Sequence, residues 1–296
     1  MKKFLSATAI IVAGILWGST GIFVRHFGDE GLSSLEIVTL RALVAAVILP
    51  LIVLIYKPSL LKLKLRDLWC FLGSGILSFL MFSCCYFYTM EQTSLSVAAV
   101  LLYSAPAMVT LMSALFFGEK LTAIKIVACV VAFVGCLLVT GVLTGDASIS
   151  VVGLVTGVLS AFGYALYSIF GRAALLRGYH PLTMTVYTFL FALLGLLFMV
   201  DLKTVISVTA KSPSNVLWAV LMGIITTILP YVFYTFGLKN IESGTASVMA
   251  SVEPVAAGIA GWLAFSEKPD AFGFAGTALV LAAIVIINIK GKKRAA

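Results

Sequence analysis

Two charged side chains lie deep inside long apolar stretches, where an unpaired charge is unfavourable. Glu253 lies twelve residues from the end of the stretch 243–265, about 18 Å deep if the stretch is a helix that rises about 1.5 Å per residue. Arg41 lies seven residues inside the stretch 34–56, roughly 10 Å deep. A lone charge in the middle of a bilayer costs at least about 2.5 kcal/mol. Three explanations are open: an Arg41–Glu253 ion pair, a protonated Glu253, or a site that exchanges a proton or binds an ammonium group.

Aromatic side chains accompany these charges. Trp17, Tyr103 and Tyr164 lie well inside their apolar stretches. A pocket lined by such rings binds flat or cationic solutes through stacking and cation–π contacts. The alternative is that the rings only fill the core of a helix bundle. Weaker candidates for the same pocket are Tyr86, Tyr231 and Tyr234.

Prolines and paired glycines mark places where helices can bend or approach one another. Pro106 and Pro254 fall inside apolar stretches. Because proline lacks an amide donor, it leaves a carbonyl without its helical partner one turn earlier. Both are candidate gating residues, although a kink can equally be static. Glycines four residues apart, as at Gly14 and Gly18, predict close contact between helix backbones.

The residue types needed for catalysis or metal binding are not clustered along the chain. His26 and His180 lie in predicted loops, and the five cysteines all lie within apolar stretches, where a free thiol behaves as a small hydrophobic group. The sequence has no phosphate-binding Gly-Lys motif. We therefore expect no catalytic residue, no metal site and no cofactor, and we expect that the protein is not an enzyme.

The elements that must position these residues are ten apolar segments. Hydrophobic residues make up 61% of the 296 residues, charged residues 11%, and the mean hydropathy is +1.14. A soluble domain carries more charge, whereas a membrane-spanning helix needs about 20 apolar residues. The composition therefore predicts an all-α integral membrane protein with ten transmembrane helices. Their predicted ranges are 4–24, 34–56, 68–90, 93–117, 121–143, 149–171, 182–200, 214–238, 243–265 and 270–290.

Basic residues are distributed unequally between the connections at the two ends of these segments. With the amino terminus inside, fourteen lysines and arginines fall in inner segments and four in outer ones. Since positive residues stay preferentially in the cytoplasm, we expect both termini there and the chain in the inner (plasma) membrane. Lys125, inside a segment near its inner end, is expected to extend its amine to the interface. This bias explains the formal charge of +8, so we expect no nucleic-acid partner.

The two halves of the chain share a motif in which a proline is followed thirteen residues later by Glu-Lys. The motif occurs at Pro106 with Glu119-Lys120 and at Pro254 with Glu267-Lys268. An offset of 148 also pairs Tyr86 with Tyr234, and an offset of 147 pairs Trp17 with Tyr164. We interpret 1–143 and 149–296 as two repeats of five helices each. Because five is odd, the second repeat must enter the membrane from the opposite face, as in many secondary transporters.

These motifs resemble those of the EamA-type, ten-helix members of the drug/metabolite transporter superfamily, and the resemblance extends over essentially the whole chain. It is carried by Tyr86-Phe87-Tyr88-Thr89-Met90, Ala98-Ala99, Pro106, Phe117-Gly118-Glu119-Lys120, Glu253-Pro254-Val255, Phe265-Ser266-Glu267, Gly14 to Gly18 around Trp17, and Arg41. The resemblance implies a central cavity between the halves and alternating access. It does not specify a substrate, since members of the family move amino acids, nucleotide precursors, vitamins, cofactors and toxic amines.

Three functional hypotheses follow. The first is a secondary transporter that exports amino-acid-like solutes or amphipathic amines. The second is an uptake carrier or facilitator for a metabolite of another class. The third, from a different class, is a membrane enzyme or scaffold without transport activity. The expected partners are a small-molecule substrate, the lipid bilayer and, as a further candidate, protons, and the chain is expected to act as a monomer or a homodimer.

Overall fold

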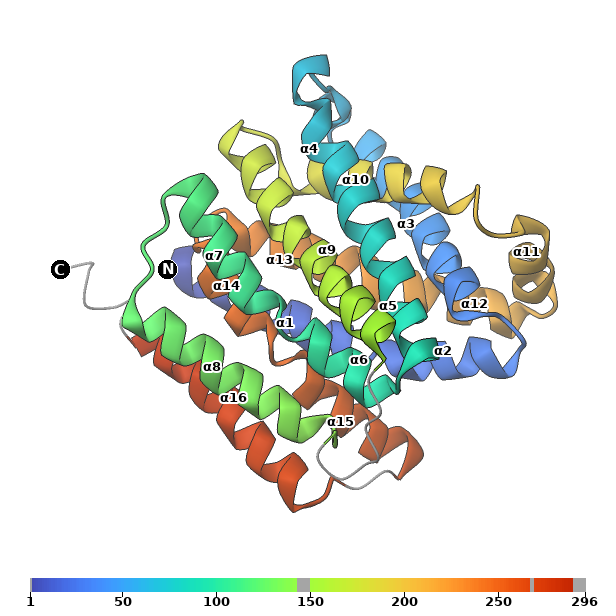
Figure 1. Ribbon diagram of the computed structural model, residues 1–296. Coiled ribbons are helices and arrows are strands. Elements are labelled where there is room, and N and C mark those ends of the chain that lie inside the picture. The colour runs from blue at the N-terminus through green and yellow to red at the C-terminus, as the bar shows by residue number, and fades with distance from the viewer. Residues whose placement is uncertain (1, 143–149, 267–268, 290–296) are drawn as a thin grey trace.

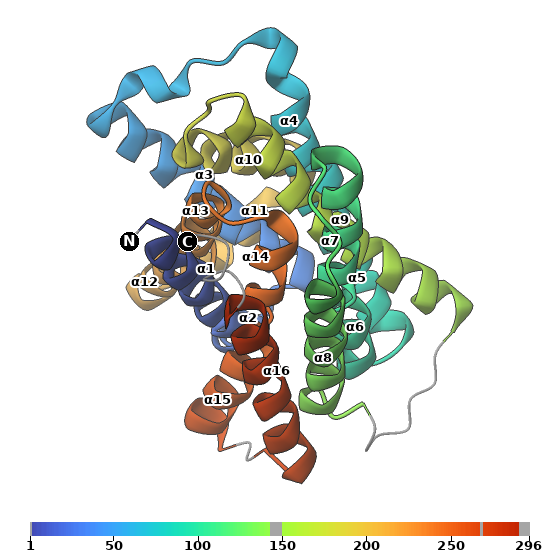
Figure 2. The same ribbon diagram turned by 90° about the vertical axis from the view of Figure 1, so that its left-hand side faces the viewer.

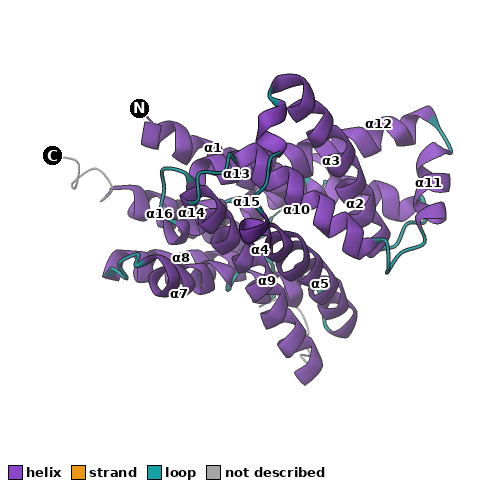
Figure 3. Cartoon of the chain, turned by 90° about the horizontal axis from the view of Figure 1, so that it is seen from above, coloured by secondary structure: helices purple, strands orange, loops and turns teal. Residues whose placement is uncertain are grey.

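The computed structural model describes residues 2–142, 150–266 and 269–289 (Figure 1). The regular elements in these ranges are helices, and no strand occurs among them (Figure 3). Large apolar side chains cover the outside, with Leu115 exposed by 78% and Leu263 by 79%. A surface of this kind is stable only in lipid. The predicted all-α membrane protein is therefore confirmed.

Eight helical spans are long and apolar enough to cross a membrane, and two shorter apolar helices accompany them in the described part of the chain. The first half contains α1 (Lys2–Gly18) with α2 (Thr20–Asp29), α3 (Ser34–Tyr56), α4 (Leu68–Leu72) with η3 (Gly73–Leu80) and α5 (Met81–Gln92), α6 (Leu95–Leu102) with α7 (Ala105–Phe117), and the shorter α8 (Ala123–Val139). The second contains α9 (Val151–Leu176), the shorter α10 (Pro181–Leu196), α12 (Pro213–Met222) with η4 (Gly223–Ile228) and α13 (Leu229–Leu238), α14 (Ser243–Ala250) with α15 (Glu253–Phe265), and α16 (Ala271–Ile289). Each predicted segment overlaps one of these ten.

Two local expectations are corrected. The short helix α11 (Leu202–Ala210) lies between α10 and α12 (Figure 1), outside the predicted segments. Asp201 caps it by accepting a hydrogen bond from the Lys203 amide at 3.0 Å. His26, predicted in a loop, belongs to α2 and stacks on Trp218 with 4.6 Å between ring centroids. Length and hydropathy alone had placed the end of the first helix too early.

Helical discontinuities recur at equivalent places in the two halves. The π-helical turns η3 and η4 each lie in the middle of a span. The helical path also breaks between α6 and α7 at Tyr103–Ser104, and between α14 and α15 at Ser251–Val252. An offset of 148 carries the first break onto the second. These spans are therefore discontinuous, and the matched breaks support the repeat.

The halves pack by exchanging partners. The first helix of each half contacts the third span of the other, so α1 lies on α13 and α9 lies on α5. The last helices, α8 and α16, lie side by side (Figures 1 and 2). This reciprocal packing supports two repeats related by a two-fold axis, and we retain their inverted orientation as a proposal. The predicted boundary between 143 and 149 and the motif residues Glu267 and Lys268 lie outside the described residues.

Candidate functional site

A small cavity of about 10 Å³ lies where the two halves meet. Its wall combines helices from both halves, chiefly α1, α9 and α13, with the π-helical turn η3. Seven of its nine lining residues are aromatic, and the other two are serines. The lining residues are Trp17, Ser78, Phe79, Phe82, Tyr164, Tyr167, Ser168, Tyr231 and Tyr234. We call this space the aromatic cavity.

Trp17 is at the centre of the ring cluster. It is only 8% exposed, and its ring centroid lies 6.2 Å from that of Tyr164, 5.2 Å from Tyr231 and 5.5 Å from Tyr234. The sequence offset had paired Trp17 with Tyr164, and the two rings do approach each other. The indole therefore faces the interior, while its role in binding stays a prediction.

Hydroxyl partners hold several of these rings in place. The Tyr234 and Ser168 hydroxyls share a hydrogen bond of 2.7 Å, as do those of Tyr167 and Thr235. Since buried polar groups need partners, both phenols are satisfied inside the bundle. Sequence reasoning missed Tyr167, although it lies three residues after Tyr164 on the same face of a helix.

A second small cavity, also of about 10 Å³, lies between the two helix breaks. Its lining residues are Leu102, Tyr103, Ala105, Pro106, Tyr164, Ser247, Ala250, Ser251 and Glu253. We call it the carboxylate cavity, because Glu253 is its charged residue. Tyr164 lines both cavities and donates a long hydrogen bond of 3.4 Å to Glu253 Oε2. Tyr164 therefore lies between the aromatic cavity and the carboxylate, and its hydroxyl contacts the carboxylate.

Glu253 is the first residue of α15, immediately after a helix break. The free amides of a helix N-terminus favour a negative charge there. Among the described residues, no ion pair includes Glu253. The helix terminus and the Tyr164 hydroxyl therefore supply its stabilisation, and the carboxylate remains available for a cation or a proton.

Arg41 does not form the ion pair with Glu253 that the sequence allowed. Its Nε donates to Thr227 Oγ1 at 2.9 Å and one Nη donates to the Thr226 carbonyl at 3.2 Å. Both acceptors belong to η4, where the wider turn alters the usual helical hydrogen bonds. The guanidinium also lies 5.7 Å from the Phe79 ring centroid. Arg41 lines neither cavity, so the structure supports a role in holding η4 rather than direct contact with a solute.

The two candidate gating prolines are not in helix interiors. Pro106 is the second residue of α7 and Pro254 is the second residue of α15. The first amides of a helix have no partner within the helix, so proline is tolerated there. The discontinuity precedes each proline, and Pro106 lines the carboxylate cavity. Any gating motion would centre on the breaks, and gating itself stays a prediction.

The second break lies directly against the backbone of α1. A Cβ atom added at Gly18 would lie 2.6 Å from the Glu253 carbonyl oxygen and 2.7 Å from the Ala257 nitrogen. One added at Gly14 would lie 2.8 Å from the Ala250 carbonyl oxygen. Carbon atoms cannot approach so closely without displacement, so these two glycines permit the contact that the sequence predicted.

Tyr86 is the site prediction that the structure supports least. It is half-buried in α5, with its ring 5.7 Å from Phe82 and 5.9 Å from Phe87. It is not among the residues that line either cavity. Phe82 lies in the wall of the aromatic cavity instead, so Tyr86 supports that wall from behind.

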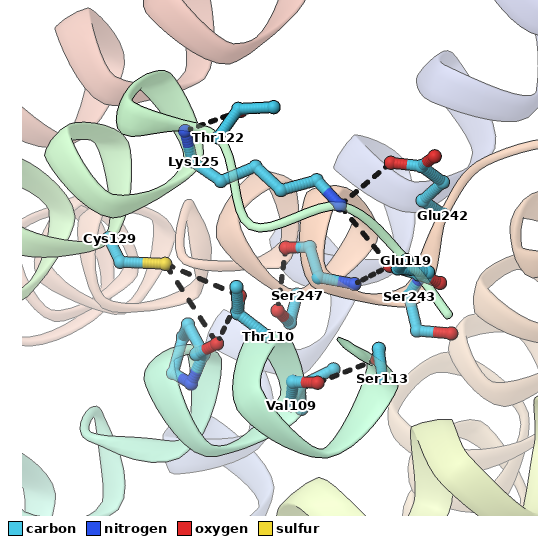
Figure 4. Close-up of polar contacts among 12 residues, drawn as sticks. Val109, Thr110, Ser113, Glu119, Thr122, Lys125, Cys129, Glu242, Ser243 and Ser247 are labelled. Atoms are coloured by element: carbon cyan, nitrogen blue, oxygen red, sulfur yellow. Dashed lines mark hydrogen bonds and ion pairs between the residues drawn. The ribbon is translucent and has the colours of Figure 1, made fainter. Parts of the chain in front are cut away.

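A buried polar cluster joins the two halves at another place (Figure 4). Glu119 Oε1 accepts a hydrogen bond from the Ser243 amide at 2.7 Å, and its Oε2 accepts one from the Gly244 amide at 3.3 Å. Lys125 Nζ lies 3.4 Å from Glu119 Oε2 and 2.7 Å from Glu242 Oε2. Lys125 therefore forms ion pairs instead of extending to the interface, and Glu119 caps α14 from the other half. Sequence reasoning used Glu119 only to mark the repeat, because the backbone amides that it caps are more than 120 residues away.

In the described part of the chain, no group of three His, Cys, Asp or Glu side chains has an arrangement that could hold a metal ion. The five cysteines are free thiols, and three of them, Cys70, Cys129 and Cys136, are buried.

Comparison with known proteins gives consistent matches over the whole length. The model of the EamA-like transporter family matches residues 4–141 and, separately, residues 151–289. The uncharacterized transporter YxxF of Bacillus subtilis (strain 168) is 26% identical over 98% of this chain and 92% of its own length. The pseudopaline exporter CntI of Pseudomonas aeruginosa (strain UCBPP-PA14) is 27% identical over 87% of each chain. A crystal structure with 16% identity superposes with a TM-score of 0.79 over 98% of this chain and 99% of that one, which indicates a shared fold.

Proposed function

Because this chain belongs to the EamA-like transporter family and is thus a multi-pass membrane transporter, we propose that it exports small amine-bearing metabolites by alternating access. The proposed solutes are amphipathic amines or amino-acid-like compounds. The single observation that carries the proposal is the pair of adjoining cavities, one lined by rings and one bearing Glu253, with Tyr164 in the wall of both.

The chemistry of the two cavities supports this class of solute. An aromatic wall attracts the apolar part of a solute, and its ring faces attract a cation. A carboxylate with no ion-pair partner binds an ammonium group or a proton. Glu253 lies in the cavity next to the rings, so a molecule with an apolar body and an amine matches both features.

Three features support a mechanism of alternating access. Discontinuous helices in secondary transporters place their breaks around the transported solute, and both breaks of this chain adjoin the carboxylate cavity. The aromatic cavity lies between the halves. The Glu119 cluster ties the α7–α8 connection to the start of α14, where it can hold the halves together at one end. We infer that rocking of the halves exposes the cavities to each side in turn.

Direction and location are proposals of their own. The pseudopaline exporter of Pseudomonas aeruginosa, 27% identical, motivates export, and uptake or facilitated movement of another metabolite class is the alternative. The basic bias supports an inner (plasma) membrane location with both termini in the cytoplasm. A membrane enzyme or scaffold is the competing class, and a flux measurement separates it from a carrier.

The test has two stages. Purified protein is screened by thermal shift against amines, amino acids, nucleosides and carboxylates, and amines with an apolar portion are expected to raise the melting temperature. The stabilising compounds are then followed in liposomes that contain the protein, with empty liposomes as the control. Flux of such an amine supports the proposal. Stabilisation only by solutes without an amine, or no flux of a tightly bound amine, would overturn it.

A further inference from the structure

The connection between α3 and α4 concentrates basic charge at one edge of the molecule. It carries Lys57, Lys62, Lys64 and Arg66 within ten positions, and all four side chains are exposed. In Figure 2 the connection crosses above α10 on its way from α3 to α4. We call residues 57–67 the basic connection.

Hydrogen bonds fix the backbone of the basic connection against the neighbouring helices. The Leu60 carbonyl accepts a hydrogen bond from Thr183 Oγ1 at 2.8 Å, and the Leu61 carbonyl accepts one from the Tyr187 hydroxyl at 2.5 Å. The Lys64 amide donates to the Tyr179 hydroxyl at 3.1 Å. The basic side chains therefore project from an ordered backbone, which lowers the entropic cost of binding a ligand.

The acid in the same connection is turned inward and does not neutralise the lysines. Asp67 is 4% exposed, accepts a hydrogen bond from the Tyr179 hydroxyl at 2.9 Å and pairs with Arg177 Nε at 3.3 Å. Arg66 reaches the same carboxylate only at 3.8 Å, with its side chain 80% exposed. No ion pair among the described residues includes Lys62 or Lys64.

The local backbone directs two lysines to one side. Lys62 and Lys64 are both extended, with φ and ψ of −74° and 122° and of −93° and 129°. Alternate residues of an extended chain point to the same side. Leu63, between them, packs against the core. The two amines consequently lie on the outer side of the connection.

The flanking residues place the basic connection at the membrane surface. Ile55 and Tyr56, at the end of α3, are 87% and 72% exposed, and Trp69, at the start of α4, is 46% exposed. Apolar and aromatic side chains at the ends of spans lie at the lipid interface. Leu65 is 89% exposed within the connection itself. An acyl chain can contact these side chains beside the lysines, whereas a free phosphate ion would leave them in water.

We propose that the basic connection binds the phosphate headgroup of anionic phospholipids in the cytoplasmic leaflet. Lys62, Lys64 and Arg66 contact the phosphate, and Leu65 and Trp69 contact the adjoining acyl chains. Basic segments next to a membrane attract anionic lipid in this way. The inference rests on the proposed inside orientation of this connection, and it is independent of what the carrier transports.

Trp69 supplies a local reporter. Its fluorescence is obtained by subtracting the emission of the Trp69→Phe protein from that of wild type. Both proteins are reconstituted in vesicles that contain either brominated phosphatidylglycerol or brominated phosphatidylcholine at equal mole fraction. Brominated phosphatidylglycerol is expected to quench Trp69 with a relative binding constant at least about threefold higher, given roughly 1 kcal/mol for each basic residue near an anionic surface. Equal quenching by the two lipids in the wild type would overturn the proposal without any variant.

The charge variant Lys62→Gln, Lys64→Gln, Arg66→Gln is expected to lose this preference. The matched control Lys120→Gln, Lys203→Gln, Lys239→Gln removes the same charge from exposed lysines elsewhere and is expected to keep it. If the charge variant kept the preference for phosphatidylglycerol, or if the control variant lost it, the proposed site would be contradicted. Inorganic phosphate should displace no more lipid than chloride at equal ionic strength, and specific displacement would indicate a free-phosphate site instead. Flux is measured separately, so failure here leaves the proposed transport untouched.

Discussion

The two helix breaks have the same backbone plan and different chemistry. The first separates α6 from α7 at Tyr103–Ser104, and the second separates α14 from α15 at Ser251–Val252. Each is followed by a proline in the second position of the next helix. The residue before that proline is a buried Ala105 in the first half and Glu253 in the second. The broken helix therefore forms without a carboxylate, so the fold alone does not explain Glu253.

The supports of the two breaks also differ. The N-terminus of α6 is capped locally, because Ser94 Oγ accepts a hydrogen bond from the Val97 amide at 3.3 Å. The N-terminus of α14 is capped from the other half of the chain by Glu119. Among the described residues, which do not include Glu267, the second break is the one capped across the interface between the halves, and it is the break that carries the charge.

The largest change in the free energy of unfolding is expected from the residues that cap α14 and α6. Glu119→Ala removes two hydrogen bonds to backbone amides and one ion pair of the buried Lys125, and breaking a buried pair costs about 3 kcal/mol or more. Ser94→Ala removes only a local cap, worth about 1 kcal/mol. Equilibrium unfolding in mixed detergent measures both losses. Equal losses would show that the two breaks are supported alike.

The glycine contacts give the next largest effect. Gly18→Ala forces a Cβ against backbone atoms of the second break, and such overpacking costs about 1–3 kcal/mol. At Gly157 an added Cβ meets side-chain atoms of Leu101, its Cδ1 most closely and its Cβ at 2.9 Å. A rotamer change relieves the closer contact and leaves the Cβ contact, so Gly157→Ala is expected to cost less than Gly18→Ala. Gly21→Ala is the control, because nothing lies within 4 Å of its added Cβ. A larger loss for Gly157→Ala than for Gly18→Ala would reverse the comparison.

The repeat partners Trp17 and Tyr164 allow the two cavities to be tested separately. Trp17→Ala removes a ring from the aromatic cavity alone and is expected to weaken substrate binding about tenfold, of the order of a desolvated cation–π contact. Tyr164→Phe keeps the ring and removes the hydroxyl that reaches Glu253. Tyr164→Phe should weaken the binding of amines more than the binding of uncharged analogues. Isothermal titration measures the affinities, and unchanged binding in folded Trp17→Ala would place the solute elsewhere.

The smallest effect concerns a carboxylate outside the spans. A hydrogen bond from Lys211, followed by one from Asn215, lowers the pKa of Glu30 below its usual value. A lowered pKa in the folded state adds stability above the unfolded pKa, and this stability is lost as the pH falls through the folded pKa. Wild type should therefore lose slightly more stability than Lys211→Gln as the pH falls from about 5 to about 3, below the unfolded pKa of about 4.3. Parallel thermal melts test this, and identical pH profiles would show that Glu30 contributes nothing.

Some of this arrangement could be read from the sequence, and some required three-dimensional contacts. Hydropathy located ten helical segments, because the length of an apolar run is set by membrane thickness. The offset that aligned the halves brought Trp17 to Tyr164, since repeats preserve spacing. The partners of Arg41 could not be predicted, because the acceptors in η4 depend on a change of helical turn that the apolar sequence does not mark. Pro106 was predicted to kink a helix, whereas it is the second residue of α7. The helix breaks at Tyr103–Ser104, just before it, and the apolar sequence does not mark that break.

The most direct test of the account is the pH dependence of transport by Glu253→Gln. Tyr103 and Tyr164 are the titratable side chains that share the cavity with Glu253; neither titrates near neutral pH in water. Flux of an identified substrate into liposomes is measured at several pH values for wild type, Glu253→Gln and the exposed control Glu91→Gln. We predict that Glu253→Gln still binds substrate through the aromatic cavity, more weakly because the ammonium loses its carboxylate, and that it loses the pH dependence of flux, while Glu91→Gln behaves as wild type. Wild-type flux and pH dependence in a stable Glu253→Gln protein would contradict the claim.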